Sequence, residues 1–386
     1  MAVFLDHAAT APLRPEALAA LTSALSQLGN PSSTHSHGQA TREILEQARD
    51  KLALAIGAHR SEVIFCSGGT EANNQAIKGI WWSRKSPTRR VIISSPLEHK
   101  ALLDPIEWLV ANEGAEFLEL PIKAGEVDLA HLEKILSERH EEIALISLMW
   151  VNNETGVITD VARVVELAKP FGIPVHSDAV AALGRVPIDF AQSGLTAMSI
   201  SGHKVGAPIG IGALIVRRDA KPISLLHGGG QERGLRSGTM NYSLASAFAA
   251  AAEQAVNQRP QTQARLLKLR DQIEQAVQSA FPSTIISAGQ AKRVEHNAHF
   301  IFPGVNNDSL LFLLDQQGIS VSAGSACQAG VLGPSHVLIG MGYSESDAAS
   351  CLRVTLGHTT TEQDAEAFIE ALKSAYPKAL AASQSR

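Results

Sequence analysis

Lys204 has the sequence context of a reactive amine. Ser201, Gly202 and His203 precede it, and the glycine-rich apolar run 210–214 follows it. A lysine that forms a Schiff base needs a partly desolvated pocket, which lowers the pKa of its amine. The alternative is an ordinary lysine on an exposed turn, where most lysines lie.

Two further side chains follow segments that have the pattern of buried strands. Asp178 ends the run 172–178, and His99 follows the β-branched run 91–93. In open α/β sheets, ligands bind beyond the carboxyl ends of the strands. An acid there can keep the ring nitrogen of a carbanion-stabilising cofactor protonated, and a histidine can stack on a ring and move protons. Either residue could instead begin a helix and bond only to backbone.

Groups that suit a phosphate follow another strand pattern. The segment 67–70, Ser-Gly-Gly-Thr, lies between the run 63–65 and a helical pattern at 71–82. Glycines let backbone N–H groups approach an anion at a helix N-terminus, although a tight turn without a ligand would look the same. The nucleotide-binding glycine patterns are absent. Asn152 and Asn153, after the run 143–148, offer amide donors or simply form a turn.

Cys327 lies in a loop-like segment with small neighbours. The stretch 323–334 contains three glycines, which favours mobility, and a thiolate there could act as a nucleophile. A buried structural cysteine is the alternative. Cys66 and Cys351 adjoin predicted strands and are expected to be such core cysteines.

Seven short motifs occur in a fixed order: Ser-Gly-Gly-Thr-Glu at 67–71, Glu-His at 98–99, Val-Asn-Asn-Glu-Thr-Gly at 151–156, His-Ser-Asp at 176–178, Ser-Gly-His-Lys at 201–204, Arg-Ser-Gly-Thr at 236–239 and Gly-Ser-Ala-Cys at 324–327. In this order the chain resembles the cysteine desulfurases of the NifS/IscS type. These are class V aminotransferase-like enzymes of fold type I that depend on pyridoxal 5'-phosphate (PLP). The likeness runs from Leu5 to Gly357, and the sequence after Cys327 is most similar to that of the actinobacterial housekeeping enzymes.

The resemblance implies how the cofactor would be held. Lys204 would carry PLP as a Schiff base, Asp178 would pair with its ring nitrogen, and His99 would stack on the ring. The other cofactor-binding positions would be Gly69, Thr70, Asn153, Ser201, His203 and Thr239. Thr239 would reach in from the partner subunit of a homodimer.

The resemblance also implies the reaction. Asn153 and Arg353 would bind L-cysteine, with the planar guanidinium of Arg353 clamping its carboxylate. Cys327 would take the sulfur as a persulfide and leave L-alanine. The sulfur would go to an acceptor protein, either an iron–sulfur scaffold or a tRNA-thiolation protein.

The chain departs from the family pattern at Ala181. Relatives usually have a glutamine there that donates a hydrogen bond to the phenolic oxygen of the cofactor, and alanine cannot donate. We expect an altered protonation equilibrium of the bound cofactor, or a water in the gap.

The elements that position these residues have the pattern of an α/β fold. Helical patterns alternate with β-branched runs over the first two-thirds of the chain, which predicts a mostly parallel sheet covered by helices. The resemblance implies seven strands in a large PLP-binding domain, 15–257, and a smaller α+β domain formed by 1–14 and 258–386, which carries Cys327. The segment 242–281 is predicted to form one long helix or two broken near Pro260, and the tail after Tyr376 is predicted to fray.

Composition narrows the function classes. The 386 residues carry a net charge of −5, and 5% are aromatic, which argues against nucleic-acid binding. Three cysteines without a C-x-x-C pair argue against disulfides and structural zinc, and His35 and His37 lack further ligands, so no metal is expected. No signal peptide or membrane span is evident, and we expect a soluble cytoplasmic protein.

Two other functions remain open at this point. One is a selenocysteine lyase or another class V aminotransferase, although a transaminase needs no nucleophile such as Cys327. The other is a catalytically quiet sulfur-relay or assembly partner, with Ala181 as a sign of decay.

Overall fold

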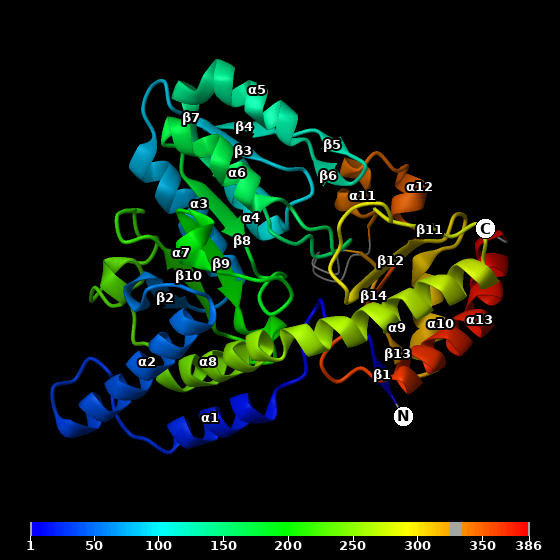
Figure 1. Ribbon diagram of the computed structural model, residues 1–386, viewed down its shortest axis with the longest axis horizontal. Coiled ribbons are helices and arrows are strands. Elements are labelled where there is room, and N and C mark those ends of the chain that lie inside the picture. The colour runs from blue at the N-terminus through cyan, green and yellow to red at the C-terminus, as the bar shows by residue number, and fades with distance from the viewer. Residues whose placement is uncertain (1, 325–332, 385–386) are drawn as a thin grey trace.

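The computed structural model describes residues 2–324 and 333–384. A large sheet flanked by helices occupies one side of the molecule, and a smaller group of strands and helices occupies the other (Figure 1). Of the helices in these residues, none combines the length and apolar character that a bilayer crossing needs.

The large sheet has seven strands, in the order β2-β10-β9-β8-β7-β3-β4. All of them run in one direction except β10, which is antiparallel to both β2 and β9. Their bounds are β2 Val63–Cys66, β10 Gly212–Val216, β9 Ala197–Ser201, β8 Val175–Asp178, β7 Ile143–Ser147, β3 Val91–Ser94 and β4 Glu116–Glu119. The predicted α/β fold with a mostly parallel seven-stranded sheet is confirmed.

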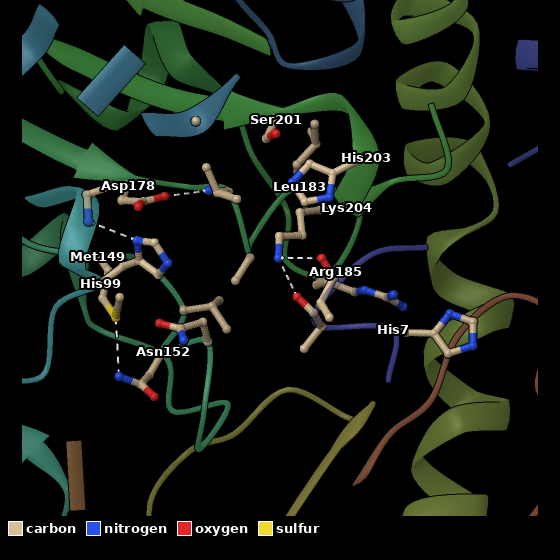
Figure 2. Close-up of a pocket in the computed structure, with 18 of the residues that line it drawn as sticks. His7, His99, Met149, Asn152, Asp178, Leu183, Arg185, Ser201, His203 and Lys204 are labelled. Atoms are coloured by element: carbon tan, nitrogen blue, oxygen red, sulfur yellow. Dashed lines mark hydrogen bonds between the residues drawn. The ribbon is translucent and has the colours of Figure 1, made fainter. Parts of the chain in front are cut away.

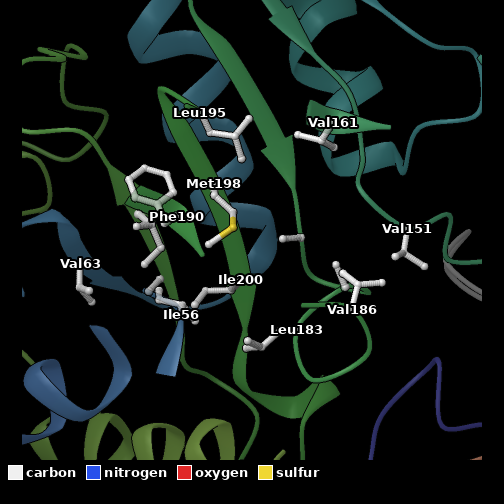
Figure 3. Packing of buried hydrophobic residues seen from close by; sticks show 14 of the residues in the cluster. Ile56, Val63, Val151, Val161, Leu183, Val186, Phe190, Leu195, Met198 and Ile200 are labelled. Atoms are coloured by element: carbon white, nitrogen blue, oxygen red, sulfur yellow. The ribbon is translucent and has the colours of Figure 1, made fainter. Parts of the chain in front are cut away.

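Helices cover both faces of this sheet, as parallel strands require. The helices α3 (Gly69–Arg84) and α4 (Lys100–Glu113) share one apolar cluster with the sheet. The opposite cluster joins the sheet to the helices α1 (Pro15–Leu25), α2 (Ser36–Ala55), α5 (Leu129–Arg139), α6 (Val161–Ala168) and α8 (Tyr242–Asn257). Figure 3 shows part of this second cluster, where Met198 and Ile200 of β9 face Phe190 and Ile56.

The smaller group has its own apolar core. Its antiparallel strands are β11 (Ile285–Ile286), β12 (Asn297–Ile301) and β14 (Cys351–Thr355), and the short strand β1 (Val3–Phe4) pairs with β13 (Ile319–Ser320). The helices α9 (Arg259–Ala280), α10 (Asn307–Asp315) and α13 (Glu362–Gln384) pack on these strands. The chain ends of the described part both lie on this side of the molecule (Figure 1).

Two expectations about helices have different outcomes. The predicted break near Pro260 is confirmed, since α8 ends at Asn257 and α9 begins at Arg259 with Pro260 in its first turn, where proline is tolerated. The prediction that the tail after Tyr376 frays is wrong. Helix α13 continues to Gln384 because Ala379 is buried in the small core.

Candidate active site

A cavity of about 380 Å³ opens at the carboxyl ends of β3, β7, β8 and β9. The residues that line it come from the loops after these strands, from the start of α3, from the N-terminal segment and from β14 (Figure 2). The expected site residues among them are Gly69, Thr70, His99, Asn153, Asp178, Ser201, His203, Lys204 and Arg353. The structure therefore brings residues from distant parts of the sequence to one cavity.

Lys204 points into this cavity and not into bulk solvent. It ends the 3-10 turn η4 (Gly202–Lys204), which follows directly from β9, and its side chain is half-buried. Its amine donates to the backbone carbonyls of Ala8 and Ala9, the latter at 2.9 Å (Figure 2). The N-terminal segment thus orients the amine, and the alternative of an exposed turn lysine is wrong.

Asp178 lies at the end of β8 and is held by two donors. The amide Nδ2 of Asn73 donates to Oδ2 at 2.8 Å, and the backbone N–H of Val180 donates to Oδ1 at 2.8 Å. Burial raises the pKa of Asp178, while the hydrogen bonds and the charges of His99 and Lys204 oppose this rise. A buried carboxylate is stabilised by a positively charged group beside it, so this position suits a cationic ligand group.

His99 caps the N-terminus of α4 and also lines the cavity. Its Nδ1 accepts the backbone N–H of Ala101 at 3.0 Å. A ring nitrogen that accepts is unprotonated, so in the neutral imidazole the proton lies on Nε2. The helix-capping role considered from the sequence and the cavity-lining role therefore coexist.

The expected phosphate side of the cavity contains Gly69 and Thr70 at the start of α3, together with Ser201 and His203. A Cβ on Gly69 would lie 2.7 Å from Cγ2 of Val180, so only glycine fits without displacement. Burial, with the nearby charge of Lys204, lowers the pKa of His203 to about 4. His203 is therefore neutral near pH 7 and acts as a hydrogen-bonding group there.

The opposite side of the cavity contains Arg353 and Asn153. Arg353, 4% exposed, comes from β14; it donates through Nη2 to Asp6 Oδ1 at 3.0 Å and through Nη1 to the Asn153 carbonyl at 3.0 Å. Asn152 forms the turn instead, because its Oδ1 accepts the N–H groups of Glu154 and Thr155. Asn153, by contrast, has a side-chain oxygen without a hydrogen-bond partner among the described residues.

The structure does not place the remaining two expected site residues at this cavity, for different reasons. Thr239 is exposed and does not line the cavity of its own chain, as far as the described residues extend. Cys327 lies outside the described residues. Cys66 and Cys351, by contrast, are buried as predicted, and burial raises the pKa of both thiols, to about 12 and about 11.

Sequence reasoning missed several residues of the site. Asn73 lies one helical turn beyond Gly69 and Thr70, so the period of α3 could have indicated it. His7 and Arg185 also line the cavity, but no local pattern distinguishes them. Ala181 lines the cavity too, so the departure from the family pattern lies at the site itself.

The residues present fit PLP. Several residues that line the cavity have a buried polar side-chain atom without a hydrogen-bond partner among the described residues, and Ser201 Oγ, Asn153 Oδ1 and Arg353 Nε are among these atoms. Buried polar atoms are rarely left unpaired, so these atoms indicate a polar ligand. An amine, a carboxylate and a glycine-containing helix start surround the same space, which matches an aldehyde, a pyridine nitrogen and a phosphate.

The chain belongs to the Aminotransferase class-V family, whose model matches residues 3–368. PLP is the cofactor of this family, and the expected cofactor is thereby confirmed.

Individual relatives define a narrower group. The chain is 46% identical over 380 residues to the IscS-like cysteine desulfurase of Mycobacterium tuberculosis, covering 97% of this chain and 96% of that protein. It is 36% identical to the cysteine desulfurase NifS of Azotobacter vinelandii, covering 95% and 90% of the two chains. The crystal structure of a NifS-like protein from Rickettsia africae superimposes with a TM-score of 0.88 at 30% identity, over 98% of this chain and 100% of that one. The resemblance to the NifS/IscS type is confirmed.

Proposed function

We propose that the chain is a PLP-dependent cysteine desulfurase, a sulfurtransferase that converts L-cysteine to L-alanine and holds the released sulfur on Cys327. The observation that carries this proposal is the cavity itself, which Lys204 and Asp178 line together with several residues whose buried polar atoms have no partner in the described part of the chain. Full-length relatives named cysteine desulfurase support the choice among class V reactions.

When bound, PLP would supply an electron sink for the substrate carbon that loses its proton. Lys204 would hold the cofactor and, once released, move the proton at the substrate Cα, since its amine is already oriented by Ala8 and Ala9. Asp178, fixed by Asn73, would keep the ring nitrogen protonated. Gly69, Thr70, Ser201 and His203 would hold the phosphate, and Asn153 the cofactor and substrate.

The substrate carboxylate would bind Arg353, which lines the cavity and whose Nε has no partner among the described residues. Bidentate binding by a guanidinium is strong and directional. Asp6 already neutralises part of this charge at 3.0 Å, so the arginine is oriented before substrate arrives. His99 would carry protons between thiol groups, because it lines the cavity and its ring is oriented by the backbone N–H of Ala101, which donates to Nδ1.

Sulfur transfer would follow at Cys327. Its thiolate would attack the substrate Sγ, which forms an S–S bond and breaks the substrate Cβ–Sγ bond. The electrons of the broken bond and protons from the site would complete L-alanine. The described residues that flank the cysteine segment support this proximity, since Gly324 and Ser335 both lie against Glu154, next to Asn153.

The persulfide would pass to an acceptor protein, an iron–sulfur scaffold first and a tRNA-thiolation protein as a second destination. A homodimer would bring Thr239 to the cofactor phosphate of the partner subunit. The buried free thiols Cys66 and Cys351 support a reducing, cytoplasmic setting.

We also propose that the chain divides into a large domain, 15–257, and a small domain, 1–14 with 258–386. The two separate apolar cores support this division, because one gathers the large sheet and the other gathers β12, β14 and α13. The break between α8 and α9 lies at the boundary.

Borohydride reduction followed by peptide mapping tests the proposal. The expected result is PLP attached to Lys204, with L-alanine and a persulfide at Cys327 formed from L-cysteine, and no persulfide in Cys327→Ser. Selenide from selenocysteine alone, or an oxo acid, would indicate the rival class V activities. A colourless chain that forms no alanine would refute the proposal and indicate a quiet relay partner.

A further inference from the structure

A buried ion pair fixes an exposed segment that follows the large sheet. Arg49 of α2 and Glu232 of the 3-10 turn η5 (Glu232–Gly234) form two hydrogen bonds, of 2.8 and 2.7 Å. Their side chains are 10% and 2% exposed. Removal of Arg49 would leave the buried charge of Glu232 without this partner, so the pair strongly constrains where Glu232 lies.

The same two side chains cover the free edge of β2. Within the described part of the chain, this strand is the last in the sheet and has β10 as its one neighbour. Arg49 Nη1 donates to the Val63 carbonyl at 2.8 Å, and the Phe65 N–H donates to Glu232 Oε2 at 2.8 Å. The ion pair therefore satisfies backbone groups that a neighbouring strand would otherwise bind. It also anchors the segment around Glu232 to strand β2.

The backbone beyond the ion pair is held in an uncommon conformation. Glu232 and Arg233 have φ values of 45° and 61°, in the left-handed region that non-glycine residues avoid. Such residues persist where the surroundings fix them, and they are frequent at functional sites. A second ion pair anchors the same segment to helix α3, where Arg236 Nε donates to Glu71 Oε1 at 2.8 Å.

The segment is also closed by bonds within itself. The N–H of Gly230 donates to Ser237 Oγ at 3.3 Å, and the N–H of Gly238 donates to Gln231 Oε1 at 3.0 Å. Thr239 follows directly, exposed and away from the cavity of its own chain. These bonds fix the exposed segment that leads to Thr239 in one conformation.

We propose that Arg49 and Glu232 are positioning residues for the cofactor site of the partner subunit. By holding the segment 228–238 in one conformation, the pair presents Thr239 at the place where the partner's PLP phosphate binds. This inference rests on the proposed function, in which a homodimer shares Thr239 between subunits. It adds that an ion pair in one subunit sets the PLP affinity of the other.

Subunit mixing tests the proposal with Glu232→Gln, which keeps the shape of the side chain and removes its charge. Loss of one hydrogen bond to a charged phosphate predicts a PLP dissociation constant raised about tenfold or more in the homodimer. Differently tagged Glu232→Gln and Lys204→Ala chains are then co-expressed, and mixed dimers are isolated by both tags. PLP is titrated by absorbance, and reduced Lys204 peptides are counted per dimer.

The mixed dimer has one site built from a normal Lys204 and a normal partner segment. It should therefore bind one PLP per dimer with the dissociation constant of dimers mixed from wild type and Lys204→Ala. A weak site in the mixed dimer would overturn the proposal, because it would show that Glu232 acts within its own subunit. Wild-type affinity in the Glu232→Gln homodimer would overturn it as well.

Controls separate this result from folding and from the underlying function. Glu362→Gln removes an exposed pair with Lys268 (3.2 Å, 62% exposed at the glutamate) and should leave PLP affinity unchanged. If Glu232→Gln does not fold, Arg49→Lys must show the same loss and the same rescue, and its failure to do so overturns the proposal. A wild-type chain that never attaches PLP to Lys204 would refute the proposed function instead.

Discussion

Asn73 offers the sharpest test of how the site controls its cofactor. Its amide donates to Asp178 Oδ2 at 2.8 Å, and both side chains are buried, 1% and 6% exposed. Asn73→Ala removes this donor from the carboxylate form of Asp178. A hydrogen bond to a charged group contributes about 1.5–3 kcal/mol, which corresponds to a rise of roughly 1–2 units in the pKa of Asp178.

The direction of the pH effect depends on which protonation state of Asp178 binds PLP more tightly. The ionised carboxylate stabilises a protonated ring nitrogen, so PLP affinity is present above the pKa of Asp178 and is lost as pH falls through it. Burial already raises this pKa, and Asn73→Ala raises it further. The pH at which PLP affinity is lost on acidification should therefore be higher in Asn73→Ala by about 1–2 pH units.

The assay is the PLP dissociation constant of the apoenzyme, measured by absorbance from acidic to neutral pH. Asn112→Ala provides the matched control, since the side chain of Asn112 is exposed and donates to the Trp108 carbonyl within α4. The control should lose PLP affinity at the same pH as the wild type. The same pH in Asn73→Ala would refute the idea that this amide lowers the pKa of Asp178.

Three further predictions concern other parts of the site. Arg353→Lys should raise the KM for L-cysteine by roughly 10- to 100-fold and leave PLP content unchanged, because a lysine cannot form the bidentate contact; an unchanged KM in steady-state assays would contradict the assigned carboxylate site. Glu154→Ala should lower the free energy of unfolding in urea by about 1–3 kcal/mol, since Glu154 accepts a hydrogen bond from the hydroxyl of Ser335 at 2.5 Å. Glu154→Gln should lower it less, because burial already raises the pKa of this carboxyl. Equal losses of stability in the two variants would contradict this reasoning. Ala181→Gln should shift the pH midpoint of the visible absorption of the loaded enzyme, and identical titrations would show that position 181 does not touch the cofactor.

The sequence predicted strands that contain β-branched apolar runs, such as β2, β3 and β7, but missed β9 and β4. Strand β9 reads Ala-Met-Ser-Ile-Ser, yet it is fully buried, because Ser199 Oγ bonds to His176 Nε2 at 2.9 Å inside the sheet. Strand β4, Glu-Phe-Leu-Glu, is an edge strand with exposed ends. Polar residues conceal a buried strand when their partners are distant in sequence, and edge strands need not be apolar.

The site was predictable where a residue follows a strand and unpredictable where contacts are long-range. Asp178 and His99 could be identified from their positions after strand patterns, and Lys204 from the glycine-containing turn before it and the apolar run after it. No local pattern links Asp6 to Arg353, which are 347 residues apart along the chain. The tail was mispredicted because its alanines suggest weak packing, whereas Ser383 Oγ accepts the N–H of Asn306 and anchors the last turn.

The cavity wall draws on two apolar cores that do not share residues. Lys204 and Asp178 follow strands of the large sheet, and Arg353 belongs to β14 in the smaller core. Cooperative units of this kind can open separately. In mild denaturant, therefore, the smaller core would open first, and the protein would lose L-cysteine binding while it keeps PLP and its yellow colour. Absorbance alone would then overestimate the fraction of active enzyme in a preparation.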